Sequence, residues 1–130
     1  MKRLYLEDLK DLDEVGVKAH LAQKYGKDGY AHDESIAREL DEYDIVIAYE
    51  SVGSWGCDSS SFFLLRHKSS GEMFEVHGSH CSCYGFEGQF ELEAVTVEHL
   101  KSDKFYLPCG GYDNNETANT KAVKDFITTL

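Results

Sequence analysis

The segment from Asp44 to Glu50 is the feature that most restricts how this chain can fold. Its sequence, Asp-Ile-Val-Ile-Ala-Tyr-Glu, puts apolar residues at successive positions, so an extended strand would show apolar side chains on both faces. A strand at the edge of a sheet or against water alternates instead between apolar and polar residues. We therefore expect Asp44–Glu50 to be a central strand.

Further strands are predicted after this one. Phe62–Arg66 and Met73–His77 are separated by Lys68–Gly71, in which Gly71 can adopt the positive φ that a hairpin turn requires. Gln89–Val95 alternates polar and apolar residues, which is typical of a strand with one buried and one wet face. Together these runs predict three or four antiparallel strands.

Patterns typical of helices lie on both sides of these strands. Leu6 and Leu9 stand at helical spacing near the start of the chain, and Asp13, Asp33 and Thr96 can each cap a helix. The expected helices cover about residues 14–25, 34–42, 97–101 and 115–130, the last with an apolar stripe that would close over the sheet. The predicted fold class is α+β: a three- to four-stranded antiparallel sheet flanked by N-terminal helices and a C-terminal amphipathic helix.

Length and composition indicate one domain spanning residues 1–130. With 42% hydrophobic residues, a core of this size needs no disulfide or metal ion to fold. No apolar run approaches the ~18 residues of a membrane span, and Glu7 stands where a signal peptide would be hydrophobic. We expect a cytoplasmic protein without a membrane partner, whose four cysteines are reduced thiols or metal ligands.

The formal charge of −11 is concentrated in the first 50 residues, which hold 13 acidic and 7 basic residues. Direct binding of DNA or RNA is not expected, because it depends on basic residues that neutralise phosphates. An acidic surface can instead meet a basic protein surface, including one that otherwise holds nucleic acid. The same charge also keeps a protein soluble, so a protein partner and simple solubility are both open interpretations.

The segment His77–Gln89 is the most unusual part of the chain. It reads His-Gly-Ser-His-Cys-Ser-Cys-Tyr-Gly-Phe-Glu-Gly-Gln and combines two histidines, two cysteines and three glycines. Glycine permits backbone conformations that other residues resist, so the chain is expected to bend here. Four interpretations are open: a metal site, a reactive thiol, a binding surface and a purely structural turn.

The metal interpretation places zinc on the cysteines together with His77 or His80. Zinc takes four nitrogen or sulfur ligands in a tetrahedron. The candidate cysteine ligands are Cys57, Cys81, Cys83 and Cys109. The Cys-x-Cys spacing fits zinc less well than the two-residue spacer of common zinc knuckles, and the chain has no second paired motif. The residues thus permit zinc without indicating it, and we expect no cofactor.

The reactive-thiol interpretation needs a base beside a cysteine, because the thiolate is the nucleophile. His80 is adjacent to Cys81 in sequence, but neighbours in an extended chain point in opposite directions. His77 or His67 would have to approach from the hairpin instead, with Glu87 to orient it, and no sequence feature fixes that arrangement. A zinc-binding or thiol-dependent small enzyme centred on Cys81 and Cys83 is the alternative to a protein that catalyses nothing.

The binding-surface interpretation rests on aromatic residues in glycine-rich loops. Loops on a rigid sheet are where recognition residues gather, and Trp and Tyr are favoured anchors at interfaces. The candidates are Trp55, Tyr84, Phe86 and Tyr112. In the structural interpretation, Trp55 instead fills one end of the core and the cysteines are small buried hydrophobic residues. Together, the binding-surface and structural interpretations favour a glycine-shaped turn that presents Tyr84 and Phe86.

The stretch His80-Cys-Ser-Cys-Tyr-Gly-Phe-Glu-Gly-Gln89 resembles a segment of small uncharacterised proteins encoded by bacteriophages. The similarity extends back through Phe62–His77 and weakly forward through Glu91–Leu100. It implies no activity and no catalytic residue, but it implies a protein made in the cytoplasm of an infected bacterium. We therefore expect a non-enzymatic protein that binds a host or phage protein, as a host-takeover factor or an anti-defence inhibitor, through its acidic helices or aromatic loops.

Overall fold

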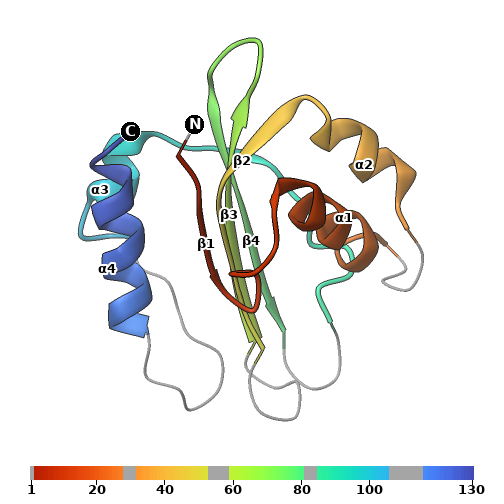
Figure 1. The fold of residues 1–130 in the computed structure, drawn as a ribbon, viewed down its shortest axis with the longest axis horizontal. Coiled ribbons are helices and arrows are strands. Elements are labelled where there is room, and N and C mark those ends of the chain that lie inside the picture. Colours follow the sequence, from red (N-terminus) through yellow and green to blue (C-terminus); the bar gives the residue numbers. More distant parts are fainter. Residues whose placement is uncertain (1, 28–31, 53–58, 81–84, 106–115) are drawn as a thin grey trace.

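The structure of the protein is a computed structural model that describes residues 2–27, 32–52, 59–80, 85–105 and 116–130. In these ranges the chain forms five strands and four helices (Figure 1). The strands are β1 (Leu4–Glu7), β2 (Tyr43–Ser51), β3 (Ser59–His67), β4 (Met73–His80) and β5 (Glu93–Ala94). The helices are α1 (Glu14–Lys24), α2 (Glu34–Leu40), α3 (Val97–Lys101) and α4 (Glu116–Ile127).

The strands form one mixed sheet in the order β1-β2-β3-β4-β5. Its centre is the antiparallel set β2, β3 and β4, in which Phe62 lies between Tyr49 and His77. β1 runs parallel to β2, with Leu6 opposite Tyr49. The α+β class is therefore confirmed, whereas the predicted three- to four-stranded antiparallel sheet is wrong in strand number and in the direction of β1.

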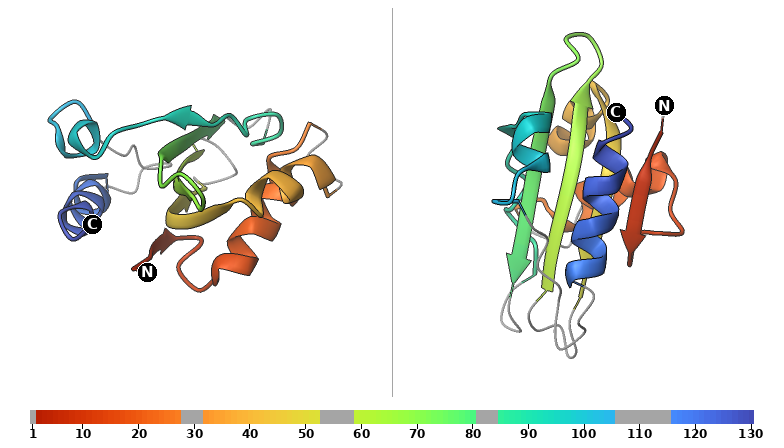
Figure 2. Two further views of the ribbon diagram at one scale, coloured as in Figure 1. Left: turned by 90° about the horizontal axis from the view of Figure 1, so that it is seen from above. Right: turned by 90° about the vertical axis from the view of Figure 1, so that its left-hand side faces the viewer.

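Helices cover both faces of the sheet. Seen from above, α1 and α2 lie on one side of the strands and α3 and α4 on the other (Figure 2). Each face has its own apolar cluster: Leu21, Tyr25 and Phe63 belong to the cluster under α1 and α2, whereas Phe62 and Val123 belong to the one under α3 and α4. Because β2 and β3 are covered on both faces, their nearly continuous apolar sequence is explained. Among the described residues no helix is long and apolar enough to cross a membrane.

The N-terminal segment is a strand and not the start of a helix. Leu4 and Leu6 pack with the cluster under α3 and α4, and Tyr5 packs with the opposite cluster. This alternation is that of a strand, and the spacing of Leu6 and Leu9 arises because a turn returns Leu9 to the core. The predicted strand Gln89–Val95 is also shorter than expected, because only Glu93 and Ala94 pair with β4.

The predicted helix starts are confirmed. Asp13 accepts a hydrogen bond from the Gly16 N–H at 2.8 Å, and Asp33 and Thr96 cap α2 and α3 in the same way. The predicted hairpin turn is confirmed as well, since Gly71 has a φ of 77°. Local capping chemistry thus determines where three of the four helices in the described ranges begin.

Candidate functional site

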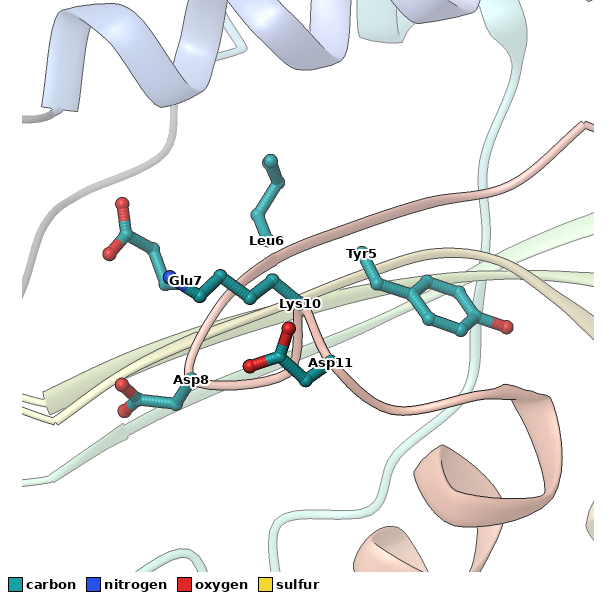
Figure 3. A pocket seen from close by; sticks show the side chains of 6 residues that line it. All are labelled: Tyr5, Leu6, Glu7, Asp8, Lys10 and Asp11. Atoms are coloured by element: carbon teal, nitrogen blue, oxygen red, sulfur yellow. The ribbon is translucent and has the colours of Figure 1, made fainter.

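The connection between β1 and α1 encloses an open hollow of about 520 Å³. Its lining consists of Tyr5, Leu6, Glu7, Asp8, Lys10 and Asp11 (Figure 3). Leu6 points toward α4, whereas the ring of Tyr5 extends in another direction (Figure 3). The Tyr5 hydroxyl donates a hydrogen bond to the Ile45 carbonyl at 3.1 Å, so this wall of the hollow is attached to β2.

Glu7 gives the hollow its shape. Its φ of 54° makes it the only residue other than glycine with a positive φ in the described part of the chain. Such a conformation costs about 1 kcal/mol or more and persists only where the surroundings hold it. The Lys10 N–H donates to the Glu7 carbonyl at 3.2 Å, and Asn119 Nδ2 of α4 donates to Glu7 Oε1 at 3.1 Å. The turn is therefore held from both its own backbone and α4.

Three carboxylates and Lys10 line the hollow, a fourth carboxylate follows it in the chain, and none of the four has an ion-pair partner among the described residues. The four carboxylates belong to Glu7, Asp8, Asp11 and Asp13. Glu14 differs, because it lies 3.1 Å from Arg3, 3.8 Å from Lys18 and accepts the Ile45 N–H at 3.0 Å. Glu7, Asp8, Asp11 and Asp13 therefore place four carboxylates without an ion pair to a described residue within seven successive positions.

Exposed apolar side chains adjoin these carboxylates. Val15 is 76% exposed, Val52 48% and Leu12 37%. Val52 lies at the same place because its N–H donates to Asp8 Oδ2 at 3.0 Å. We call Glu7, Asp8, Asp11 and Asp13 together with Leu12, Val15 and Val52 the β1–α1 surface. It combines apolar contact area with four carboxylates and, in the lining of the hollow, one lysine, Lys10.

A buried polar network lies beneath the α1 helix. Glu50 of β2 is 4% exposed, and its Oε1 accepts the Tyr25 hydroxyl at 2.6 Å and lies 2.9 Å from His20 Nε2. Burial first, and then the charge and hydrogen bond of Glu50, raise the pKa of Tyr25 well above its usual value, while Ser61 acts in the opposite direction. Tyr25 therefore stays protonated and donates to Glu50. The network attaches α1 to β2, the strand that directly precedes Val52.

Residues 85–89 of the unusual segment are attached to the core. Phe86 is 6% exposed and its ring stacks on Tyr25 with a centroid distance of 4.9 Å. Gln89 binds Ser79 at both backbone groups, with Oε1 accepting the N–H at 2.8 Å and Nε2 donating to the carbonyl at 2.9 Å. The Gly88 N–H donates to the Gly26 carbonyl at 2.8 Å. This half of the segment is a structural clasp between β4 and the end of α1.

Of the site residues predicted from the sequence, only Phe86 lies within the described ranges. Its ring is in the core and not on the surface. The other candidates lie outside the described residues: Trp55, Tyr84, Tyr112, Cys57, Cys81, Cys83 and Cys109. Within the described ranges, no three His, Cys, Asp or Glu side chains are placed to hold a metal ion.

The β1–α1 surface was not identified from the sequence. The signal was present, since residues 7–14 contain five acids and one base, but the segment was expected to be helical. A helix would have spread those carboxylates around its axis. The strand and turn instead bring three of them, Glu7, Asp8 and Asp11, to one hollow.

Comparison of the chain with protein-family models, with curated proteins and with solved structures found no match. The function is therefore argued from the site itself.

Proposed function

We propose that this protein acts by binding another protein, without catalysing a reaction, and that the β1–α1 surface receives a basic segment of that partner. One observation carries the proposal. Three carboxylates that form no ion pair with a described residue, Glu7, Asp8 and Asp11, line one open hollow together with Lys10. Asp13 and the exposed side chains of Leu12 and Val15 follow directly in the chain, and Val52 is joined to Asp8 by a hydrogen bond. This combination fits a partner that offers both positive charge and apolar contacts.

The two components of the surface have different roles. Burying exposed apolar area such as Val15 supplies affinity, about 1.5–3 kcal/mol for a whole side chain. The carboxylates speed encounter with a positively charged partner and disfavour acidic ones. Because these carboxylates are at the surface, a basic partner can pair with them without the large desolvation cost of burying an isolated charge.

The partner is proposed to be a host or phage protein in the bacterial cytoplasm. The resemblance of His80–Gln89 to bacteriophage proteins supports that setting, and the acidity of the chain supports a basic partner. A protein surface that otherwise holds nucleic acid has that charge. Occupying it would make the protein a host-takeover factor or an anti-defence inhibitor.

The test is affinity capture from bacterial lysate with three forms of the protein. The first is wild type. The second is the triple variant Asp8→Asn, Asp11→Asn, Asp13→Asn, which removes three charges. The asparagine side-chain oxygen can still cap α1 at position 13 and can still accept the Val52 N–H at position 8. The third form carries the matched changes Glu91→Gln, Glu98→Gln and Asp103→Asn at exposed positions elsewhere.

The proposal predicts a protein that wild type and the matched control retain and the triple variant loses. Equal retention by all three forms would contradict the proposal that the partner binds the β1–α1 surface. Retention of no protein by wild type would contradict the proposal that this chain binds a bacterial protein.

A further inference from the structure

A second hollow lies at the opposite edge of the sheet, where β4 and β5 meet α3. It measures about 390 Å³ and is lined by Glu75, Ala94, Val95, Thr96 and His99. In the strand order β1-β2-β3-β4-β5 it is separated from the β1–α1 surface by the whole width of the sheet. Its chemistry is therefore independent of the proposed partner site.

Glu75 is the distinctive residue of this hollow. Its side chain is 12% exposed, and its Oε2 atom is buried without a hydrogen-bond donor among the described groups. A buried carboxylate oxygen that lacks a donor has lost its hydration without a hydrogen bond to offset the loss. Native structures contain such a group where water, an ion or a ligand completes its hydrogen bonds, where it stores strain, or where a reaction uses it.

The nearest cation does not offset this loss of hydration. His77 Nε2 lies 3.2 Å from Glu75 Oε2, but not in the geometry of a hydrogen bond, and the pair is an ion pair only while the imidazole is protonated. His77 is half exposed, and its ring lies 5.1 Å from that of Phe62. Glu75 thus has a charged neighbour only when His77 is protonated, and its Oε2 atom has no hydrogen-bond donor among the described residues.

A second carboxylate adds negative charge beside Glu75. Glu93 of β5 is its direct partner across the antiparallel pair, and residues paired in this way point to the same face of a sheet. Two like charges directly opposite one another destabilise a sheet. Glu93 is not among the residues that line the hollow, so a cation bound there would reduce this repulsion through Glu75.

We propose that this hollow binds an organic cation of the ammonium or guanidinium class, with Glu75 as the group that accepts its N–H. The cation would supply the missing donor and offset the repulsion between Glu75 and Glu93. The alkyl part of the ligand would lie against Ala94 and Val95, which line the hollow. An organic cation fits better than a metal ion, because no three ligand side chains converge among the described residues.

The experiment is an NMR titration of the ¹⁵N-labelled protein at about pH 8, where histidine side chains are mostly neutral. The probes are n-butylamine, n-butanol as its neutral counterpart, and a short peptide with one lysine flanked by glycines. We expect saturable shifts at the amides of Glu75 and residues 94–99 with both cationic probes. Tighter binding of the peptide would assign the cation to a protein side chain, and tighter binding of the amine to a free small molecule.

Variants separate this site from nonspecific effects. Glu75→Gln should weaken binding of the amine at least tenfold, because a neutral amide replaces the buried charge. The triple variant of Asp8, Asp11 and Asp13 should bind it as wild type does. Equal shifts with n-butanol, shifts that do not saturate, or unchanged binding by Glu75→Gln would each overturn the proposal. None of these outcomes depends on whether the β1–α1 surface binds a protein.

Discussion

Replacing Gly78 of β4 with alanine tests whether the clasp of residues 85–89 is packed as described. A methyl group at position 78 would lie 2.4 Å from Ser61 Oγ and 2.8 Å from Phe86 Cδ1. Both distances are well inside ordinary van der Waals contact, so Ser61 has to rotate and the Phe86 ring has to leave its position on Tyr25. The substitution therefore perturbs the unusual segment through its only described aromatic residue.

The expected cost follows from two opposing effects. Overpacking a core by one methyl group costs about 1–3 kcal/mol. Alanine also restricts the unfolded chain, which returns about 0.4–1 kcal/mol. We expect Gly78→Ala to lower the free energy of unfolding by about 1–2 kcal/mol, which for a chain of 130 residues lowers Tm by roughly 4–7 °C.

Urea unfolding of five proteins makes this test specific: wild type, Gly78→Ala, Ser79→Ala, Phe86→Leu and the double variant of positions 78 and 86. Ser79→Ala changes the exposed neighbouring position and should stay within about 0.5 kcal/mol of wild type. In a Phe86→Leu background the shorter side chain leaves room for the methyl group, so Gly78→Ala should cost about 1 kcal/mol less than it does alone. Stability of Gly78→Ala equal to that of wild type, or the same cost in both backgrounds, would refute the packing of Phe86 against β4.

Three further predictions concern the hydrogen bonds and the titration of the fold. Tyr25→Phe removes the hydroxyl that donates to the buried Glu50 carboxylate and should lower the free energy of unfolding in urea by about 1.5–3 kcal/mol. Tyr5→Phe should cost less, because the Tyr5 hydroxyl donates to a neutral backbone carbonyl. Equal costs would contradict a stronger hydrogen bond to the Glu50 carboxylate than to that carbonyl. Burial and the Glu14 carboxylate raise the pKa of Tyr5 to about 12 from its usual 10.0, so the folded state keeps a proton that the unfolded chain loses. The stability that this residue contributes is fully present below about pH 10 and is lost as the pH rises toward 12. The free energy of unfolding of wild type should therefore fall more steeply with pH in this range than that of Tyr5→Phe, and equal slopes would count against the raised pKa. Gln89→Ala removes the side chain that binds both backbone groups of Ser79, so amide exchange at Ser79 should become faster by about tenfold or more, whereas unchanged exchange would mean that Gln89 does not hold the clasp.

Much of the fold was predictable because local chemistry determines it. Asp13, Asp33 and Thr96 cap their helices where the sequence places them, and Gly71 forms the hairpin turn. The unbroken apolar run around Ile45 to Tyr49 correctly indicated a central strand, because only a strand covered on both faces has that composition.

The edges of the sheet were not predictable in the same way. β1 has four residues and pairs with a strand more than forty positions later in the chain, so its identity depends on a distant neighbour. The spacing of Leu6 and Leu9 fits a helical period as well as it fits a strand followed by a turn. β5 contains only Glu93 and Ala94, because the chain leaves the clasp and turns toward α3 on either side of these two residues. No local sequence pattern indicates that path.

The candidate site depended on those same edges. Glu7, Asp8 and Asp11 line one hollow at a turn where Glu7 adopts a positive φ and accepts a hydrogen bond from Asn119, which lies near the far end of the chain. The role of Phe86 was likewise hidden, since its partner Tyr25 lies in a different predicted element. Gly78 was the available clue, because a glycine inside a strand marks a close approach by another group.

The affinity of the purified partner for the triple variant of Asp8, Asp11 and Asp13 tests the proposed function most directly. Each exposed charge pair contributes about 0.2–1 kcal/mol, and 1.4 kcal/mol is a factor of ten in Kd. The proposal predicts that calorimetric titration finds the triple variant about tenfold weaker than wild type at low salt, with the difference shrinking as salt is added. The matched Glu91, Glu98 and Asp103 variant should bind as wild type does. Equal Kd values for all three proteins would show that the partner does not bind the β1–α1 surface.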